Sequence, residues 1–527
     1  MIIWDRIILG GVIIMRIRWC VLGVSFGVVL FGIFILGGWT TSNIEGEQSA
    51  EWWMLQEVAA LDVEQSETAN QATFPNCRLG ASIWSPYQTS VEFDLFHFGT
   101  YINFSSEALP GIADLDFWPM VRLKQDRGTG GEYLDSYTVQ PTWTTLEAVV
   151  RANPGKLWIV GNEPDREFVQ DDTYPDVYAR AYHDIYTFIK DVDPTARIAV
   201  AGLVGFTPGR EQYLDIVWDT YATLYGSSMP ADAWTIHPYV LWESGGGGGH
   251  VALGTDPTLA IPYSPICNDP ASICYAEHDD MQLFIEQIVR MRQWMSRHGQ
   301  RNKPLMVTEW GIILPEDFVD EEGANFSATR VSTYLRATQD YFRTAVDSLV
   351  GHQVDDNRLI QQWQWFAFGV DEVQSSSSRL VEVASPYYST DVGKAWQQYA
   401  AAIPPVIDLR VRAADAVIFN PSTSVTLTAT LYNVGNIGAQ HPVTVAFYIS
   451  STAHIPFHTQ TLDIVPGCMW GQSITATWSQ TWSPGRHPYW VNVETYDDSS
   501  LVIATSAQGW IWVDPKQVFM PLVLRNR

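Results

Sequence analysis

Eight short apolar runs recur between Arg78 and Pro405, and they constrain the fold more than any other feature of the chain. Amphipathic stretches of helical periodicity separate them, such as the one that places Phe284, Ile288 and Met295 on one face. Strands that alternate with helices are typical of a parallel α/β sheet, and eight such units predict a (β/α)8 TIM barrel. The predicted strands are Leu79–Ile83, Phe98–Phe104, Pro119–Lys124, Leu157–Gly161, Arg197–Leu203, Ala233–Tyr239, Leu305–Thr308 and Ile360–Phe366.

The pattern changes after two consecutive prolines at the end of this segment. Apolar residues alternate with threonines from Val425 to Leu431, and the same period of two recurs from Val443 to Ile449. We therefore expect an all-β, immunoglobulin-like sandwich. Its YNVGNIG turn resembles the adhesion-type modules of exported bacterial proteins, which serve as spacers or binding modules. The expected domains are a signal peptide or membrane anchor at 1–39, an acidic linker at 40–76, the barrel at 77–405, the sandwich at 406–513 and a C-terminal tail at 514–527.

The N-terminal segment predicts export or anchoring. Arg16 and Arg18 precede the uncharged apolar stretch 19–39, which is long enough for a signal peptide or a membrane span. Residues 40–76 contain no Lys or Arg, so the positive-inside rule places the rest of the chain outside the cytoplasm. We expect a secreted or surface-anchored protein, with cleavage of the segment and a membrane tether through residues 19–39 both left open.

Four cysteines remain when Cys20 of the apolar stretch is set aside, and an even number outside the cytoplasm favours disulfides. Cys267 and Cys274 flank a short loop and are the expected pair. Cys77 and Cys468 either pair by elimination or stay as two buried thiols, because four cysteines allow three connectivities.

Composition excludes one class of partner. The chain has 58 acidic and 31 basic residues, and a net charge of −27 repels nucleic acid. Its 23 Trp and 23 Tyr residues fit two interpretations, a large core or rings that stack on flat ligands such as sugars.

Two predicted strands end in glutamates. LWIVGNEPD runs into Asn162 and Glu163, and KPLMVTEWG runs into Glu309. Active sites of (β/α)8 barrels form at these strand ends, and glycoside hydrolysis needs one protonated and one ionised carboxyl group. Mutual repulsion is expected to raise the pKa of one of them and so keep it as an acid at neutral pH. The alternative is that both are ordinary solvated loop carboxylates.

These motifs resemble those of clan A glycoside hydrolases, the retaining (β/α)8 families. The resemblance covers residues 78–405, and PMVRLK, GNEPD and TEWG are similar to segments of glycoside hydrolase families 128, 5 and 39. It implies that Glu163 is the acid/base, that Glu309 is the nucleophile and that Asn162 contacts the sugar 2-hydroxyl.

Two further strands carry candidate substrate-binding residues. His237 and Tyr239 alternate onto one face of the sixth strand, and the resemblance implies that the tyrosine hydrogen-bonds the nucleophile. Trp363 and Trp365 share a face of the eighth strand, where the same families place a Trp under the sugar. We prefer Trp365 for this role. The alternative for all four is packing in the core.

Some weaker candidates flank these positions. Arg122 and Lys124 end the third strand, where a cation either bonds sugar hydroxyls or forms a surface ion pair. Trp84 and Trp310 follow other strands. The long glycine-rich loop 242–278 is expected to be a wall of the cleft or a flexible insertion.

The implied activity is hydrolysis of a β-linked oligo- or polysaccharide with retention, and this chemistry requires no metal or organic cofactor. A non-catalytic cell-surface protein that binds glycans for adhesion would keep the same fold. A transglycosylase would use the same residues and differ only in the acceptor. A separation of about 5 to 5.5 Å between the two carboxyl groups is the value expected for retention.

Overall fold

The computed structural model describes residues 3–9, 12–18, 75–243, 248–419, 424–453, 455–497 and 500–514. The apolar stretch 19–39, nearly all of the acidic linker and nearly all of the C-terminal tail lie outside these residues. None of the described helices is both long and apolar enough to cross a bilayer. The chain divides into two compact units, 1–71 and 72–527. In the first, β1 (Ile3–Leu9) and β2 (Val12–Arg18) form an antiparallel pair.

The second unit contains a large parallel sheet, and each of the eight predicted strands is present in it. Its hydrogen-bonded order is β5-β4-β3-β12-β11-β10-β9-β8-β6-β7. The strands that match the prediction are β3 (Asn76–Ser82), β4 (Phe98–Ile102), β6 (Met120–Arg127), β8 (Leu157–Val160), β9 (Arg197–Val200), β10 (Ala233–Ile236), β11 (Leu305–Val307) and β12 (Gln362–Trp365).

The sheet closes on itself where a proline interrupts one strand. β5 (Asp116–Phe117) pairs with β4, and β6 begins three residues later and pairs with β8. Met120 N–H donates to Ser105 O at 2.9 Å on one side, while Ile159 N–H donates to Pro119 O at 2.9 Å on the other. Because Pro119 has no N–H, the ladder is broken at this residue, although the chain runs on as one strand. β7 (Tyr133–Gln140) pairs with β6 as an antiparallel addition.

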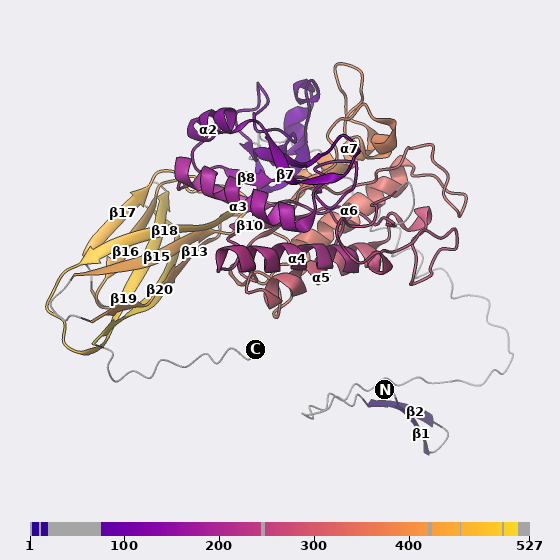
Figure 1. The fold of residues 1–527 in the computed structure, drawn as a ribbon. Coiled ribbons are helices and arrows are strands. Elements are labelled where there is room, and N and C mark those ends of the chain that lie inside the picture. The colour runs from indigo at the N-terminus through magenta and orange to yellow at the C-terminus, as the bar shows by residue number, and fades with distance from the viewer. Residues whose placement is uncertain are drawn as a thin grey trace. The chain divides into compact units, whose positions relative to one another are not determined.

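Helices follow most strands and pack against the sheet (Figure 1). The helix α5 begins after Asp280, whose side chain accepts hydrogen bonds from the N–H groups of residues 282 and 283, as its position before the apolar pattern predicts. The helices are α2 (Trp143–Ala152), α3 (Pro175–Val192), α4 (Pro208–Tyr225), α5 (Met281–Arg297), α6 (Ala328–Thr344) and α7 (Asp391–Ala401).

Alternate strand residues build two separate cores. One set, which includes Leu157, Ile159 and Met306, forms a small cluster inside the barrel. Their strand neighbours, such as Trp158 and Val307, belong to the large cluster between the sheet and the helices. The period of two along each strand therefore decides which side chains face the barrel interior.

The C-terminal part is a β-sandwich. One sheet has the order β13-β15-β18 and the other β14-β20-β19-β16-β17, and a single apolar cluster draws residues from both. In immunoglobulin-type sandwiches the second and fifth strands share a sheet opposite the third, sixth and seventh. The observed order is compatible with this, and the immunoglobulin-like assignment stays a prediction. The strands are β13 (Leu409–Ala413), β14 (Ala416–Ile418), β15 (Val425–Asn433), β16 (Val443–Tyr448), β17 (His458–Leu462), β18 (Met469–Trp478), β19 (Gly485–Asp497) and β20 (Ser500–Val513).

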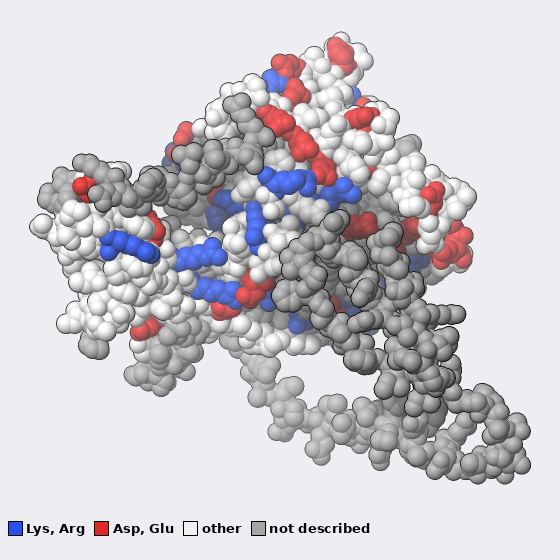
Figure 2. Space-filling view, turned by 90° about the horizontal axis from the view of Figure 1, so that it is seen from below, with Lys and Arg blue, Asp and Glu red and all other residues white. Residues whose placement is uncertain are grey.

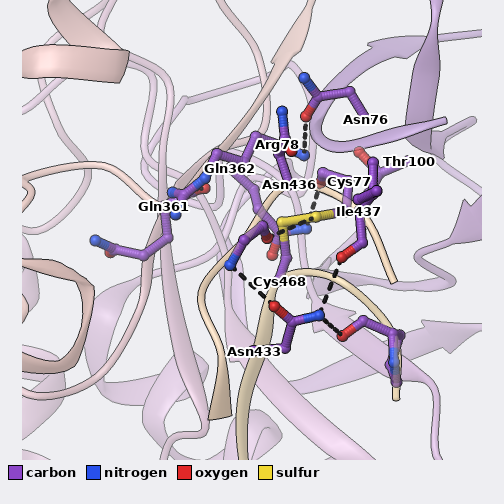
Figure 3. The surroundings of a disulfide bond; sticks show 12 residues. Asn76, Cys77, Arg78, Thr100, Gln361, Gln362, Asn433, Asn436, Ile437 and Cys468 are labelled. Carbon is purple, nitrogen blue, oxygen red and sulfur yellow. Dashed lines mark hydrogen bonds between the residues drawn. A yellow bond between two sulfur atoms is a disulfide. The ribbon is translucent and has the colours of Figure 1, made fainter. Parts of the chain in front are cut away.

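A disulfide joins the barrel to the sandwich. Cys77 of β3 bonds to Cys468, and Cys77 N–H donates to Asn436 O at 2.9 Å (Figure 3). Next to it, the buried Arg78 guanidinium donates to Asp355 at 2.7 Å and to Val434 O at 2.7 Å. The pairing that the sequence left open is thus present in the structure.

The second disulfide, Cys267–Cys274, closes the short loop predicted for it. The expected pair is therefore formed.

Acidic and basic side chains are intermixed on the molecular face drawn in Figure 2. Glu211 pairs with both Arg290 and Arg297. The net charge of −27 thus coexists with local pairing of the cations.

Candidate active site

Glu163 is held in the barrel by the turn that follows β8. Gly161 takes a φ of +90°, a conformation that favours glycine, and Glu163 itself lies at a φ of +44°. The N–H of Glu163 donates to Gly202 O at 2.9 Å, and the N–H of Asn162 donates to Asp171 Oδ2 at 2.8 Å. These bonds fix the turn, so the Glu163 side chain is buried with only 2% of its surface exposed.

Glu309 follows the end of β11 and lies close to Tyr239. The Tyr239 hydroxyl donates to Glu309 Oε2 at 3.3 Å. The next residue, Trp310, is fully buried and packs edge-on against Trp365 with ring centroids 4.4 Å apart. Trp310 is therefore a core residue that supports the backbone beneath Glu309.

The two glutamates meet around a histidine. A carboxylate oxygen of Glu163 and one of Glu309 lie within 4.8 Å of each other and of a His237 ring nitrogen. His237 Nδ1 is 2.9 Å from Glu163 Oε1 and 3.5 Å from Glu309 Oε1, while Nε2 is 3.0 Å from Thr308 Oγ1. The structure thus brings together four residues that sequence analysis named as candidates, Glu163, Glu309, His237 and Tyr239.

Different neighbours give the two carboxyl groups opposite electrostatics. Burial disfavours ionisation of Glu163, but the charge of Arg166 and the bond from His237 outweigh it and lower the pKa of Glu163 to about 2. Burial, together with the negative charge of Glu163, raises the pKa of Glu309 to about 7 against the opposing effect of His237. Burial lowers the pKa of His237, but the negative charges of Glu309 and Glu163 raise it by more, so the pKa of His237 is raised overall.

This distribution corrects one point of the sequence-based expectation. The two groups do differ in pKa, but the raised pKa belongs to Glu309 and the lowered pKa to Glu163, the expected acid. The reason is Arg166, three residues after Glu163, whose Nη1 donates to Glu163 Oε2 at 2.9 Å. Sequence spacing did not indicate this contact.

Both carboxylates line a cavity of about 580 Å³ with two aromatic walls. On one wall Trp84 stacks on Phe104 with centroids 5.3 Å apart, and Phe366 meets Trp84 edge-on. On the other, Trp242 meets Tyr275 with centroids 4.5 Å apart. Rings flanking a polar floor suit a ligand that has both apolar faces and hydroxyl groups, as sugars do.

Trp242 and Tyr275 belong to the long loop after β10, of which residues 244–247 lie outside the described residues. Among its described residues, these two lining positions agree with the interpretation of the loop as a wall of the cleft.

The structure places the two tryptophans of β12 away from the cavity. Trp363 and Trp365 are fully buried and belong to the cluster between sheet and helices, where Trp365 Nε1–H donates to Ser378 O at 2.7 Å. Gln362 and Gln364 occupy the opposite face of the strand, and Phe366 lines the cavity. The expectation of a Trp under the sugar is thus corrected, because the apolar face of this strand turns to the helices.

Asn162 lies behind the cavity wall. Its Nδ2 donates to Gln170 Oε1 at 3.1 Å, and Gln170 lines the cavity. Its Oδ1 is buried without a hydrogen-bond partner among the described residues. A contact of Asn162 with a sugar hydroxyl stays a prediction.

Of the weaker candidates, one lines the cavity and the others do not. Trp84 lines the cavity. Arg122 is engaged with Asp171 and Gln170 and so supports the turn after β8, and Lys124 is exposed. Of the cavity residues, Arg166, Phe104 and Phe366 were missed by sequence reasoning.

The Glu163–His237–Glu309 cluster has the side-chain types of a metal site, with one ligand atom each within 4.8 Å. Both oxygens of Glu163, however, already accept hydrogen bonds, one from the Arg166 cation. We therefore assign the cluster to proton chemistry.

A closed parallel barrel whose strand ends hold a buried carboxylate pair in an aromatic cavity defines a site for acid–base or nucleophilic chemistry on a small polar ligand.

No protein-family model matches the chain. No curated protein matches it either. Among solved structures it is similar to a GH128 (subgroup I) endo-β-1,3-glucanase from Amycolatopsis mediterranei in complex with laminaritriose, at 11% identity and a TM-score of 0.37, covering 61% of this chain and 98% of that one.

Two other similar structures are a β-glucuronidase from Bacteroides uniformis and a glucosidase from Croceicoccus marinus. The β-glucuronidase has 11% identity and a TM-score of 0.34, covering 83% of this chain and 46% of that one. The glucosidase has 11% identity and a TM-score of 0.37, covering 78% and 94%. The structural neighbours are thus glycosidases of low sequence identity.

Proposed function

We propose that the protein is a retaining glycoside hydrolase that cleaves β-linked oligo- or polysaccharides. The observation that carries this proposal is the buried pair Glu163 and Glu309, with carboxylate oxygens within 4.8 Å of each other in an aromatic-lined cavity. Retaining enzymes keep their carboxyl groups about 5 to 5.5 Å apart, whereas inverting enzymes need about 6.5 to 9.5 Å to admit a water molecule.

The mechanism has two steps. Glu309 attacks the anomeric carbon as Glu163 gives its proton to the glycosidic oxygen, so the bond to the leaving sugar breaks and a glycosyl ester forms on Glu309. Glu163 then takes a proton from water, which attacks the same carbon and releases Glu309. Tyr239, 3.3 Å from Glu309 Oε2, is placed to stabilise that oxygen whenever it is ionised.

The substrate class follows from the walls and the motifs. Trp84, Phe104 and Phe366 offer ring faces and edges to sugar C–H groups. The resemblance of the Glu163 and Glu309 segments to clan A enzymes directs attention to β-linkages. We place soluble β-glucans and 4-nitrophenyl β-glycosides first in a substrate panel.

We also propose that the protein acts outside the cytoplasm, secreted or tethered through residues 19–39. Two disulfides support this location, because such bonds persist in oxidising compartments. Fractionation of the host cells tests it: recovery of the reduced protein in the cytosol would contradict the proposal.

The experiment compares wild type with Glu163→Gln, Glu309→Gln and the control Glu316→Gln on the panel. Glu316 is exposed on the segment that follows Glu309, so its variant should keep wild-type activity. Both site variants should lose at least about 1,000-fold in kcat, because an amide can act neither as the nucleophile nor as the acid. Glycan binding by calorimetry should persist in Glu309→Gln.

Binding of a glycan without turnover by the wild type would favour the non-catalytic alternative. Proton NMR of the first product gives the stereochemical result: the β-anomer is expected, and initial release of the α-anomer would contradict retention. Transfer to added sugar in place of water would identify a transglycosylase with the same residues.

A further inference from the structure

Both oxygens of Glu163 are occupied in the empty cavity. Arg166 Nη1 donates to Oε2 at 2.9 Å, and His237 Nδ1 lies 2.9 Å from Oε1. An acid that protonates a glycosidic oxygen needs one carboxyl oxygen that carries the proton and faces the substrate. Because both contacts stabilise the ionised form of Glu163, at least one of them has to weaken before Glu163 can carry a proton to the substrate.

His237 is the fixed partner. Its ring is almost fully buried, and its second nitrogen lies 3.0 Å from Thr308 Oγ1. Gly202 lies so close that a Cβ there would come within 2.5 Å of Nε2. Gly202 packs against the ring, and both ring nitrogens have hydrogen-bond partners. The ring therefore cannot leave Glu163 unless two strands move.

Arg166 is the displaceable partner. It lines the cavity, and 19% of its side chain is exposed. Among the described residues, Arg166 also donates from Nη2 to Gly248 O at a longer distance of 3.3 Å, and its Nε is buried without a hydrogen-bond partner. A saccharide that enters the cavity meets this guanidinium at Oε2, where the leaving-group oxygen has to bind.

We propose that Arg166 is a positioning residue that keeps Glu163 as a carboxylate in the empty site and leaves Oε2 when a saccharide binds, so that substrate itself turns Glu163 into the acid. The inference rests on the proposed glycosidase function. It adds a substrate-driven activation step.

The remaining charged groups around Glu163 include a pair that largely compensates itself. From its own turn comes Asp165, which is paired at 2.8 Å with the buried Arg210 of α4, so these two charges largely compensate each other. Arg210 also contacts Glu243. The other groups that face Glu163 are His237, Tyr239 and Glu309.

The proton has a short path. Once Arg166 leaves, the His237 Nδ1–H gives its proton to Glu163 Oε1, 2.9 Å away, and accepts the proton of Glu309 from Oε1, 3.5 Å away. His237 ends unchanged, Glu309 becomes the carboxylate that attacks, and Glu163 becomes the acid. No proton enters from solvent.

The kinetic test compares pH profiles of Arg166→Met, Arg166→Lys and the control Lys124→Met on the panel substrate with the highest kcat/KM. Removing the cation should move the alkaline limb of kcat/KM, which reports the free enzyme, upward by about 1 to 2 pH units. The limb of kcat, which reports the complex, should move by less than about 0.3 units, because Arg166 has already left Glu163 there. Arg166→Lys should stay near wild type, and Lys124→Met should match it.

An unmoved kcat/KM limb in Arg166→Met overturns the inference, and so does an equal shift of both limbs, which would mean that Arg166 stays on Glu163 during turnover. A merely structural arginine would change activity at all pH values without moving either limb.

A second measurement needs no turnover. In the full-length protein with 13C-labelled glutamate, NMR titration follows the Glu163 carboxyl carbon, assigned through Glu163→Gln. Arg166→Met should raise its midpoint by at least about one pH unit, and an unchanged midpoint overturns the inference. If this midpoint rises but no panel member is hydrolysed, the electrostatic role stands and the proposed function fails.

Discussion

Glu163 and Glu309 are the same chemical group in two different environments. Glu163 has two close donors, one of them the cation Arg166, whereas Glu309 is bonded by the neutral Tyr239 hydroxyl. Equal burial therefore ends in opposite pKa shifts, downward at Glu163 and upward at Glu309.

The two shifts predict opposite effects of pH on stability. The pKa of Glu309 rises from 4.5 to about 7 on folding, so its ionisation costs stability increasingly as pH rises through this window. Glu309→Gln should thus raise the free energy of unfolding at pH 8 by roughly 1 to 3 kcal/mol and change it little at pH 4. Urea unfolding at the two pH values measures this.

Glu163→Gln is the matched comparison with the opposite sign. The pKa of Glu163 falls on folding, so its ionised form contributes stability above pH 4.5, and this contribution is lost as pH falls toward 2. The variant should be less stable than wild type at pH 8. A gain in stability there, or a loss for Glu309→Gln, would contradict the assigned environments.

At the scale of the element, most of the site follows from the parity of the strands. The residue two positions beyond the last inward side chain of a strand reaches the cavity in three places: Trp84 after β3, Phe104 after β4 and Phe366 after β12. Glu163 has the same parity but lies four positions beyond Ile159, the last inward residue of β8. This rule would have found Phe104 and Phe366 from the sequence. The prediction of a Trp under the sugar was wrong because the tryptophans of β12 pack against the helices, whereas its glutamines face the barrel interior.

Other site features were beyond sequence reasoning. Glu309 departs from the parity of β11, whose Leu305 and Val307 face the helices, so only its strand-end position marked it. Arg166 reaches Glu163 because the turn reverses there, which depends on the Glu163 backbone at a φ of +44°. Neither conformation is encoded by spacing alone.

Trp365, the last residue of β12, and Phe366, which follows it, directly test the alternation of side chains between the helices and the cavity. Phe366→Ala should raise KM or lower kcat/KM about 10-fold or more while leaving the melting temperature within a few degrees, because Phe366 is half-buried in the cavity wall. Trp365→Ala should instead cost about 3 to 5 kcal/mol of stability, because it empties a fully buried site. Steady-state kinetics and calorimetry measure both, and a Trp365→Ala enzyme that is stable but catalytically poor would reverse the assignment.

For the whole molecule, the sandwich completes the base of the barrel. Trp470 of β18 packs against the apolar cluster inside the barrel, and its Nε1–H donates to Gln362 Oε1 at 2.9 Å. The Arg78 guanidinium lies 5.4 Å from the same ring, beside the Cys77–Cys468 bond. The alternation pattern predicted the sandwich, but this contact joins residues more than a hundred positions apart and left no local signal.

Trp470→Ala tests this joint. The variant should lose about 2 to 4 kcal/mol of stability through the cavity it leaves at the end of the barrel, with kcat/KM per folded molecule unchanged. Ser473→Ala on the same strand, where the side chain is exposed, is the control and should match wild type. Denaturant unfolding decides: wild-type stability in Trp470→Ala would show that the sandwich is only appended to the barrel.

The most direct test of the two-glutamate mechanism is the trapping of its covalent intermediate. The protein is incubated with a 2-deoxy-2-fluoro β-glycoside of the hydrolysed sugar, digested with trypsin and sequenced by mass spectrometry. The two-glutamate mechanism predicts one fluoroglycosyl group on Glu309 in the peptide Asn302–Arg330, and none on the Glu163 peptide Leu157–Arg166. Hydrolysis without any adduct and with inversion, or an adduct on Glu163, would contradict it.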